Sequence, residues 1–247
     1  YPGAEEDVLH DISFTAEPGK TTAFIGSTGC GKSTLVNLIP RFYDVTDGKI
    51  TIDGKDIRNV SQHELREKLG YVPQKAVLFS GDIASNILYG NPEGSEAEMT
   101  EAATIAQATE FIEQKKKKYK STISQGGSNV SGGQKQRLSI ARAIAKHPDV
   151  YIFDDSFSAL DYKTDATLRA KLKEKTSEST VMIVAQRIST ILHADQIIVL
   201  DDGQIVGKGT HKELLKTCEA YYQIASSQLS EKELEEDLKE VESYAKR

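Results

Sequence analysis

The sequence predicts an α/β fold, in which a β-sheet core is combined with helices. Short apolar runs rich in β-branched residues alternate along the chain with segments of helical periodicity. Between residues 82 and 147 helix-forming residues dominate instead, and a stretch of roughly 70 residues is too long for a loop and should pack as a subdomain. We therefore expect a sheet core formed by residues 1–81 and 148–229, interrupted by a helical insertion at 82–147.

Each expected helix and strand follows from the pattern of apolar and polar residues in its own segment. After Ser230, Leu234, Leu238 and Val241 recur at helical spacing among many charged residues, which predicts an acidic C-terminal helix over 230–247. A solvated helix is the favoured interpretation of this stripe, and partner contact is the alternative. Strands are expected at 22–25, 49–53, 71–72, 150–154, 180–184 and 196–200, and helices at 32–39, 96–107 and 131–146.

Composition excludes several classes of protein. The chain of 247 residues is 38% hydrophobic and 28% charged, as in ordinary globular proteins, and its net charge of −6 speaks against nucleic acid as a partner. No stretch approaches the roughly 18 to 20 apolar residues that span a bilayer, and the opening residues do not predict a signal peptide. The chain opens on Tyr1 without an initiator methionine, so we expect it to be an excised domain. Cys30 and Cys218 lack metal-ligand spacing and suit a reducing cytosol.

A glycine-rich loop lies between the expected strand at 22–25 and the expected helix at 32–39. Its glycines let successive N–H groups point into one concavity, which attracts anions together with the positive end of the following helix. Lys32 adds a charge that bridges the β- and γ-phosphates, and the Ser33 hydroxyl is expected to coordinate Mg²⁺. The loop predicts an ATP·Mg²⁺ site built from Gly26, Ser27, Thr28, Gly29, Cys30, Gly31, Lys32 and Ser33.

Mg²⁺ needs a second hard ligand, usually an aspartate at the end of a neighbouring buried strand. Asp154 ends the apolar run 150–154 and fits this role. Taken alone, an aspartate at a strand end is as often a helix cap as a ligand.

A second anion site is expected where Ser131, Gly132, Gly133 and Gln134 open a helix. Within one chain, two such helix starts facing one nucleotide would be redundant. If two chains meet head to tail, each Ser-Gly-Gly-Gln motif covers the γ-phosphate held by the other chain.

Together these motifs, in this order and spacing, resemble the nucleotide-binding domain of ATP-binding cassette (ABC) transporters over nearly the whole chain. The resemblance implies a P-loop NTPase (RecA-like) core, a helical signature subdomain and an antiparallel β part near the N-terminus. It assigns Lys32 and Ser33 to the Walker A motif, Asp154 to Walker B and residues 158–161 to the D-loop. It implies that Tyr1 stacks on adenine and that ATP is also contacted by Thr34, Gln74 and the signature residues Ser131–Gln134. It implies Mg²⁺ contacts for Ser33, Gln74 and Asp154. It implies catalytic roles for Lys32, Gln74, Asp155 and Gln186.

Four positions depart from the family pattern. Asp155 stands where the family has the glutamate that activates water, and its carboxylate is withdrawn by about 1.5 Å. Gln186 stands where the family has a switch histidine, and an amide cannot carry a proton as histidine can. Gln125 replaces a glutamate common in exporters, and Val130 replaces the usual leucine of the signature. Two changes around one γ-phosphate, with the rest of the site kept, favour a coordinated loss of hydrolysis over tolerated drift.

The segments 79–87 and 209–215 resemble the exporter branch in particular. The resemblance therefore implies an exporter's ATPase domain at the cytoplasmic face of the cell membrane, attached to a transmembrane domain. Its partner is expected to be a second nucleotide-binding domain on a different chain, in a heterodimer with one slow and one competent site. A soluble ABC-type ATPase and a nucleotide sensor without turnover are the alternatives.

Overall fold

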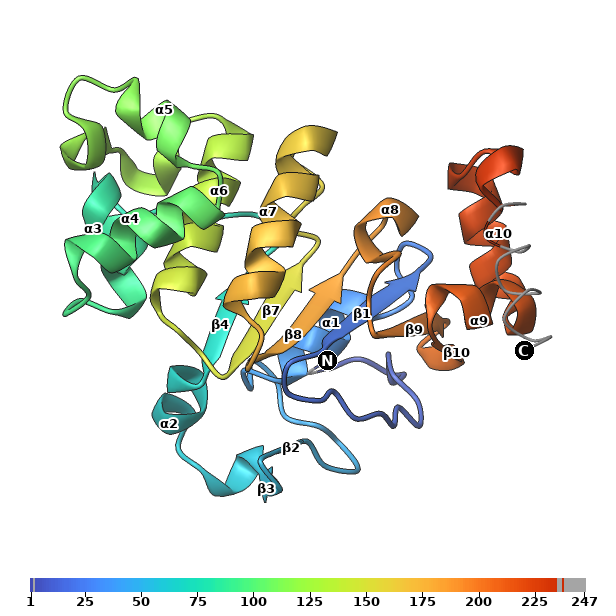
Figure 1. The fold of residues 1–247 in the computed structure, drawn as a ribbon. Coiled ribbons are helices and arrows are strands. Elements are labelled where there is room, and N and C mark those ends of the chain that lie inside the picture. The colour runs from blue at the N-terminus through green and yellow to red at the C-terminus, as the bar shows by residue number, and fades with distance from the viewer. Residues whose placement is uncertain (2, 235–236, 238–247) are drawn as a thin grey trace. The chain divides into compact units, whose positions relative to one another are not determined.

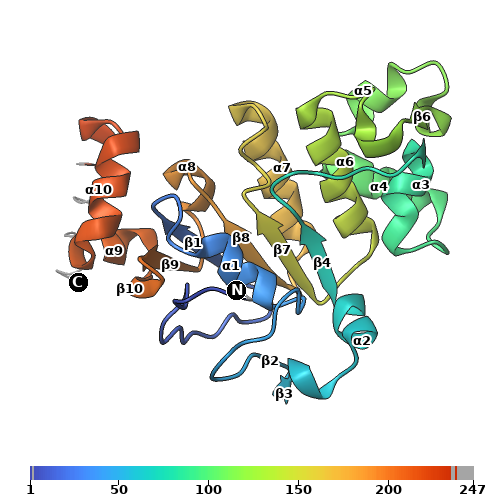
Figure 2. The same ribbon diagram turned by 180° about the vertical axis from the view of Figure 1, so that it is seen from behind.

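The computed structural model describes residues 1, 3–234 and 237 (Figures 1 and 2). The chain divides into two compact units. The first unit contains Tyr1–Leu65 together with the described residues from Thr180 onward, and the second contains Arg66–Ser179. Helix α2, Gln62–Glu67, carries the chain from the first unit into the second. No helix of the described part has the length and apolar character that crossing a bilayer requires.

The sheet of the first unit is centred on β1, Thr21–Gly26. Strands β8, Thr180–Val184, and β9, Gln196–Asp201, flank β1 and run parallel to it, and β10, Gln204–Gly209, pairs antiparallel with β9. Phe24 pairs with Val184 on one side and with Ile198 on the other. Phe24 and Ile198 are fully buried, as is typical of parallel strands covered on both faces.

Helices and one small hairpin complete the first unit. Strands β2, Thr51–Ile52, and β3, Lys55–Asp56, form an antiparallel pair around Asp53 and Gly54, which both have positive φ. In both views α9 and α10 lie beside β10 (Figures 1 and 2). Among its described residues, this unit contains, besides α2 and the helical residues 231–234, the helices α1, Lys32–Leu38; α8, Ile188–Ile191; α9, His211–Thr217; and α10, Glu219–Gln228.

The second unit combines a parallel strand pair with a group of helices. Strand β4, Leu69–Val72, runs parallel to β7, Val150–Asp154, with Val72 opposite Phe153, and β5, Gly81–Asp82, pairs with β6, Thr122–Ile123. Helix α6, Gly132–Ala145, packs against α3, Ile83–Ile87, and α4, Glu96–Ile105. The remaining helices are α5, Thr109–Glu113, and α7, Tyr162–Lys175.

The expected α/β fold is confirmed, and the expected strands correspond to β1, β2, β4, β7, β8 and β9. The antiparallel part near the N-terminus is the β2–β3 pair, whereas residues 3–20 contain no strand. The expected C-terminal helix over 230–247 lies largely outside the described residues, of which 231–234 are helical. The domain limits at 82, 147 and 230 stay predictions.

Candidate nucleotide-binding site

The glycine-rich loop runs from the end of β1 to the start of α1. Gly26, Gly29 and Gly31 have φ values of 155°, 88° and 98°, which side-chain-bearing residues rarely adopt. A Cβ on Gly26 would lie 2.0 Å from the Leu200 carbonyl oxygen, so this residue must be glycine. A Cβ on Gly29 would meet nothing within 4 Å, so the space beside this part of the loop is open. The loop therefore has the bent backbone and the room that phosphate groups need.

Lys32 lies folded over this loop. Its Nζ donates to the carbonyl oxygens of Gly26 and Ser27, both at 2.7 Å, and lies 3.5 Å from the Cys30 Sγ. The side chain is nearly buried, at 9% exposed. The ammonium group is thus held at the mouth of the loop by two neutral acceptors, which phosphate oxygens can replace with stronger, charge-assisted bonds.

The N-terminal residue approaches the same helix. The Tyr1 hydroxyl lies 2.7 Å from the Thr34 Oγ1, and the Tyr1 ring packs edge-on against Tyr43 at 4.9 Å between centroids. The Tyr1 ring is 52% exposed, so one face remains open to stack on a planar base.

Gln186 lies at the same edge of the first unit's sheet as the glycine-rich loop. Strands β1 and β8 are parallel, so their carboxyl ends coincide, and the Ala185 amide donates to the Phe24 carbonyl oxygen at 3.0 Å. Gln186 follows directly and is exposed. The structure therefore brings together the loop, Lys32, Thr34, Tyr1 and the edge that carries Gln186 within one unit.

The second unit carries the acidic part of the expected site. Strands β4 and β7 run parallel, so Gln74, after β4, and Asp154 and Asp155, at the end of β7, come to the same edge. The Gln74 Nε2 donates to the Asp155 Oδ2 at 3.0 Å. The two carboxylates are only 4% and 7% exposed, and Asp155 has a φ of 47°. Asp155 is thus a buried carboxylate held by an amide.

Two neighbours of this acidic pair were not foreseen from the sequence. Burial, with the adjacent Asp154 carboxylate, raises the pKa of Tyr71, so its ring stays neutral beside that charge. Ser156 is fully buried and donates through Oγ to the Val72 carbonyl oxygen at 2.9 Å, which fastens the end of β7 to β4. The place of Ser156 directly after Asp155 was visible in the sequence, whereas Tyr71 comes beside Asp154 only through the parallel pairing of β4 with β7. Neither residue had been assigned a role.

The Ser131–Gln134 motif forms the start of α6. The Gln134 amide donates to the Ser131 Oγ at 3.3 Å, and the Ser131 amide donates back to the Gln134 Oε1 at 3.2 Å. This capping box holds the exposed Ser131 and Gly132 at the tip of a 14-residue helix. A Cβ on Gly133 would lie 3.3 Å from the Ala159 carbonyl oxygen, so the motif borders the 158–161 segment.

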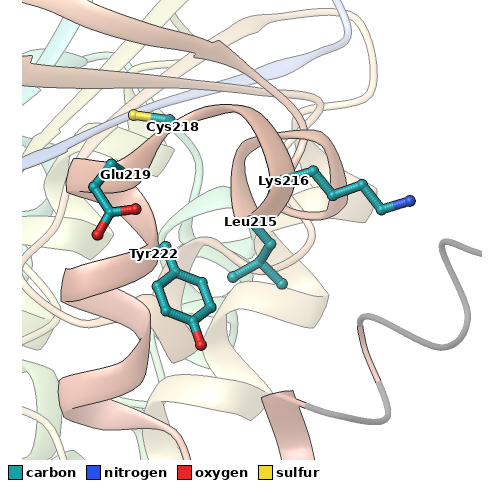
Figure 3. A pocket seen from close by; sticks show the side chains of 5 residues that line it. All are labelled: Leu215, Lys216, Cys218, Glu219 and Tyr222. Atoms are coloured by element: carbon teal, nitrogen blue, oxygen red, sulfur yellow. The ribbon is translucent and has the colours of Figure 1, made fainter.

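A pocket of about 200 Å³ lies elsewhere in the first unit, between α9 and α10 (Figure 3). It is lined by Leu215, Lys216, Cys218, Glu219 and Tyr222, and none of the expected nucleotide-site residues lines it.

The donor chemistry fits Mg²⁺ bound together with ATP. Ser33, Gln74 and Asp154 offer a hydroxyl, an amide carbonyl and a carboxylate, which are the hard oxygen ligands that Mg²⁺ prefers. No group of three or more His, Cys, Asp or Glu side chains that could hold a metal occurs within the described residues. A single carboxylate with water and phosphate ligands is the usual arrangement for Mg²⁺, whereas zinc needs such a group.

Comparison with known proteins identifies the family. The model of the ABC transporter family matches residues 9–158. An uncharacterized ABC transporter ATP-binding protein of Mycobacterium bovis is 50% identical over 231 residues, which are 92% of this chain and 39% of that protein. A putative multidrug export ATP-binding/permease protein of Staphylococcus aureus is 44% identical over 228 residues, again 92% of this chain and 39% of that protein.

A solved structure extends this likeness to three dimensions. The structure of a bacterial Atm1-family ABC exporter with ATP bound matches with a TM-score of 0.88 at 39% identity, covering 92% of this chain and 40% of that one. The chain thus spans about two fifths of the length of these relatives. This chain therefore belongs to the ABC transporter family, as an ATP-binding domain of the ATPase type.

Proposed function

We propose that this chain is the ATP-binding domain of an ABC exporter and that it holds ATP·Mg²⁺ in a slow site. One relative is named a multidrug export protein and the solved relative is an exporter, which supports attachment to a transmembrane domain at the cytoplasmic face of a membrane. The observation that carries the slow-site proposal is the buried Asp155 carboxylate, bonded to Gln74 at 3.0 Å and one methylene shorter than the family's glutamate.

Each residue of the proposed site has its own role in binding or hydrolysis. The loop amides and Lys32 bind the β- and γ-phosphates, Tyr1 stacks on adenine, and Ser33, Gln74 and Asp154 hold Mg²⁺. Bound Mg²⁺ supplies charge neutralisation at the phosphates. Asp155 is the residue that orients the attacking water, and its retracted carboxylate is misplaced by about 1.5 Å, a distance that can cost on the order of 100-fold in rate. Gln186 donates an amide hydrogen bond to the γ-phosphate but carries no positive charge.

The signature keeps Ser131 to Gln134, with Val130 in place of the usual leucine, and we propose that it serves a second nucleotide-binding domain on a different chain. The capping box presents Ser131 and the exposed N–H groups of α6 at the surface, where a γ-phosphate held by another chain can be bound. The chain would then have a slow site of its own and complete a competent site on its partner.

ATP turnover tests the slow site. We expect slow hydrolysis by the wild-type chain and an increase on the order of 10- to 100-fold in an Asp155→Glu, Gln186→His variant, because the longer carboxylate and the imidazole restore the base and the switch. Lys32→Ala in that variant is the control and should abolish turnover. Brisk hydrolysis by the wild-type chain contradicts the proposal.

Complementation tests the contribution of the signature. A chain with Asp155→Glu, Gln186→His and Ser131→Arg, called here the restored, signature-blocked variant, should be inactive alone. Each of its restored sites would face a signature that the arginine blocks. Adding the wild-type chain should recover turnover, since its intact signature completes the restored site. Adding wild-type chain with Ser131→Arg should recover nothing, and recovery with that control would contradict action across two chains.

A further inference from the structure

The backbone around Gln186, which stands at the family's switch position, is hydrogen-bonded by a residue from a distant part of the chain. Gln228, the last residue of α10, donates through Nε2 to the Gln186 carbonyl oxygen at 2.9 Å and accepts through Oε1 from the Ile188 amide at 2.8 Å. One side-chain amide thus bonds both backbone groups that flank Arg187. A neighbouring strand would pair with this segment in the same way.

The contact fills a gap in the local structure. Helix α8 begins at Ile188 with Arg187 at its N-cap, and no side chain of the cap residue bonds the first-turn amides. Gln228 supplies that missing acceptor from another helix, because a first-turn N–H otherwise has no intrahelical partner. The link therefore fixes where β8 ends and where α8 begins, which is the segment that carries Gln186.

The far end of the contact is rigidly held. Tyr221 and Ala225 are both fully buried on α10 and, with Gln228, recur at spacings of four and three residues, so all three share one face of the helix. The Tyr221 hydroxyl lies 2.7 Å from the Nδ1 of His211, which joins α10 to α9. Gln228 projects from an anchored helix, so its amide has a defined position.

We propose that Gln228 is a positioning residue for ATP hydrolysis, which holds the Gln186 backbone so that the Gln186 side chain meets the γ-phosphate. This inference rests on the proposed role of Gln186 in the site. Only a primary amide of this length serves both contacts, since glutamate keeps the acceptor but loses the donor, and alanine loses both.

Hydrogen exchange at the Ile188 amide tests the contact without any turnover. We expect protection in the wild-type chain, retention of much of it in Gln228→Glu, and its loss in Gln228→Ala. The matched control is Gln223→Ala, since Gln223 is an exposed glutamine of the same helix whose Nε2 donates to the Glu219 Oε1 at 3.0 Å. Unchanged exchange in Gln228→Ala overturns the proposal.

Nucleotide measurements test the role. In the Asp155→Glu, Gln186→His background, Gln228→Ala should lower the single-turnover rate on the order of 10-fold while ADP affinity stays within about twofold, because only the γ-phosphate contact is displaced. Gln228→Glu should fall between, and Gln223→Ala should match its parent. In the otherwise unmodified chain, Gln228→Ala should lower the ratio of ATP to ADP affinity.

These outcomes separate this inference from the proposed function. A wild-type chain that hydrolyses ATP briskly contradicts the slow site but leaves every Gln228 comparison measurable in that chain. Equal losses of ATP affinity, ADP affinity and turnover in Gln228→Ala indicate a structural role only and overturn the positioning role.

Discussion

Cys30 makes the glycine-rich loop open to a chemical test at the scale of a single residue. Its thiol is 4% exposed, and its Sγ lies 3.5 Å from the Lys32 Nζ. We predict that one equivalent of N-ethylmaleimide at Cys30 abolishes ATP binding, because the adduct occupies the space that Lys32 and the phosphates share. ATP should slow the reaction, and mass spectrometry with a nucleotide-binding assay checks both.

The control for this prediction uses the second cysteine. Cys218 is also buried, at 6% exposed, and lies between α9 and α10, away from the loop. A Cys218→Ala chain should respond as the wild type does, whereas Cys30→Ala should bind ATP and resist the reagent. Loss of binding in reagent-treated Cys30→Ala would refute the assignment.

Single residues also show what the sequence can and cannot predict. The loop residues were predictable because backbone geometry demands glycine at fixed positions, and Gly26 has no room for a Cβ. Gln228 was not predictable, because its bonds to Gln186 and Ile188 join residues 42 and 40 positions apart and depend on how α10 packs. Tyr71 beside Asp154 is of the same kind, since only the parallel pairing of β4 and β7 brings them together.

At the scale of elements, the same capping pattern serves two helices with different tasks. Ser131 and Ser95 each accept from the amide three residues on and form a capping box, at the starts of α6 and α4. We predict that Ser131→Ala and Ser95→Ala each lower the free energy of unfolding by about 1 kcal/mol, since each removes one cap acceptor. Denaturant unfolding of both variants measures this.

The pair separates the cap from the proposed anion contact. Only Ser131→Ala should weaken the ability of the chain to complement the restored, signature-blocked variant, because only Ser131 has a proposed contact with the partner's nucleotide. If Ser95→Ala reduced complementation as strongly, the effect of Ser131→Ala would be one of stability alone.

Elements with strong local signals were predicted correctly, and those without were missed. The buried apolar runs of β1, β7, β8 and β9 and the capped helix α6 were all expected. Strand β10 was missed because its residues alternate between exposed and half-buried, so no continuous apolar run marks it. The four-residue α8 is too short to show a helical period, and it forms where the chain leaves β8 and meets Gln228.

At the scale of the whole chain, the expected functional residues fall in both compact units. The loop, Tyr1 and Gln186 belong to the first, and Gln74, the acidic pair and the signature belong to the second. The sequence predicted a core built from two separated stretches, 1–81 and 148–229, whereas the first unit consists of Tyr1–Leu65 and the described residues from Thr180 onward. The residues assigned to the proposed site therefore come from both stretches of the first unit and from the second unit.

The stability of the chain at alkaline pH provides a further prediction at this scale. Tyr151 is 2% exposed, and burial raises its pKa from 10.0 to about 12, with a smaller contribution from Glu101. Because the folded-state pKa lies above the unfolded one, the stabilisation is fully present below pH 10 and is lost as the pH rises from 10 to about 12. We expect Tyr151 to contribute a loss on the order of 2 kcal/mol across this window, and Tyr151→Phe should remove that part of the alkaline loss. Tyr71 and Tyr221 keep their own contributions, because burial also raises the pKa of each. Urea unfolding at pH 8 and pH 11 measures it, with Tyr162→Phe as the control because that ring is 74% exposed and folding buries little of it. Equal alkaline losses in wild-type chain and Tyr151→Phe would show that another group sets the alkaline limit.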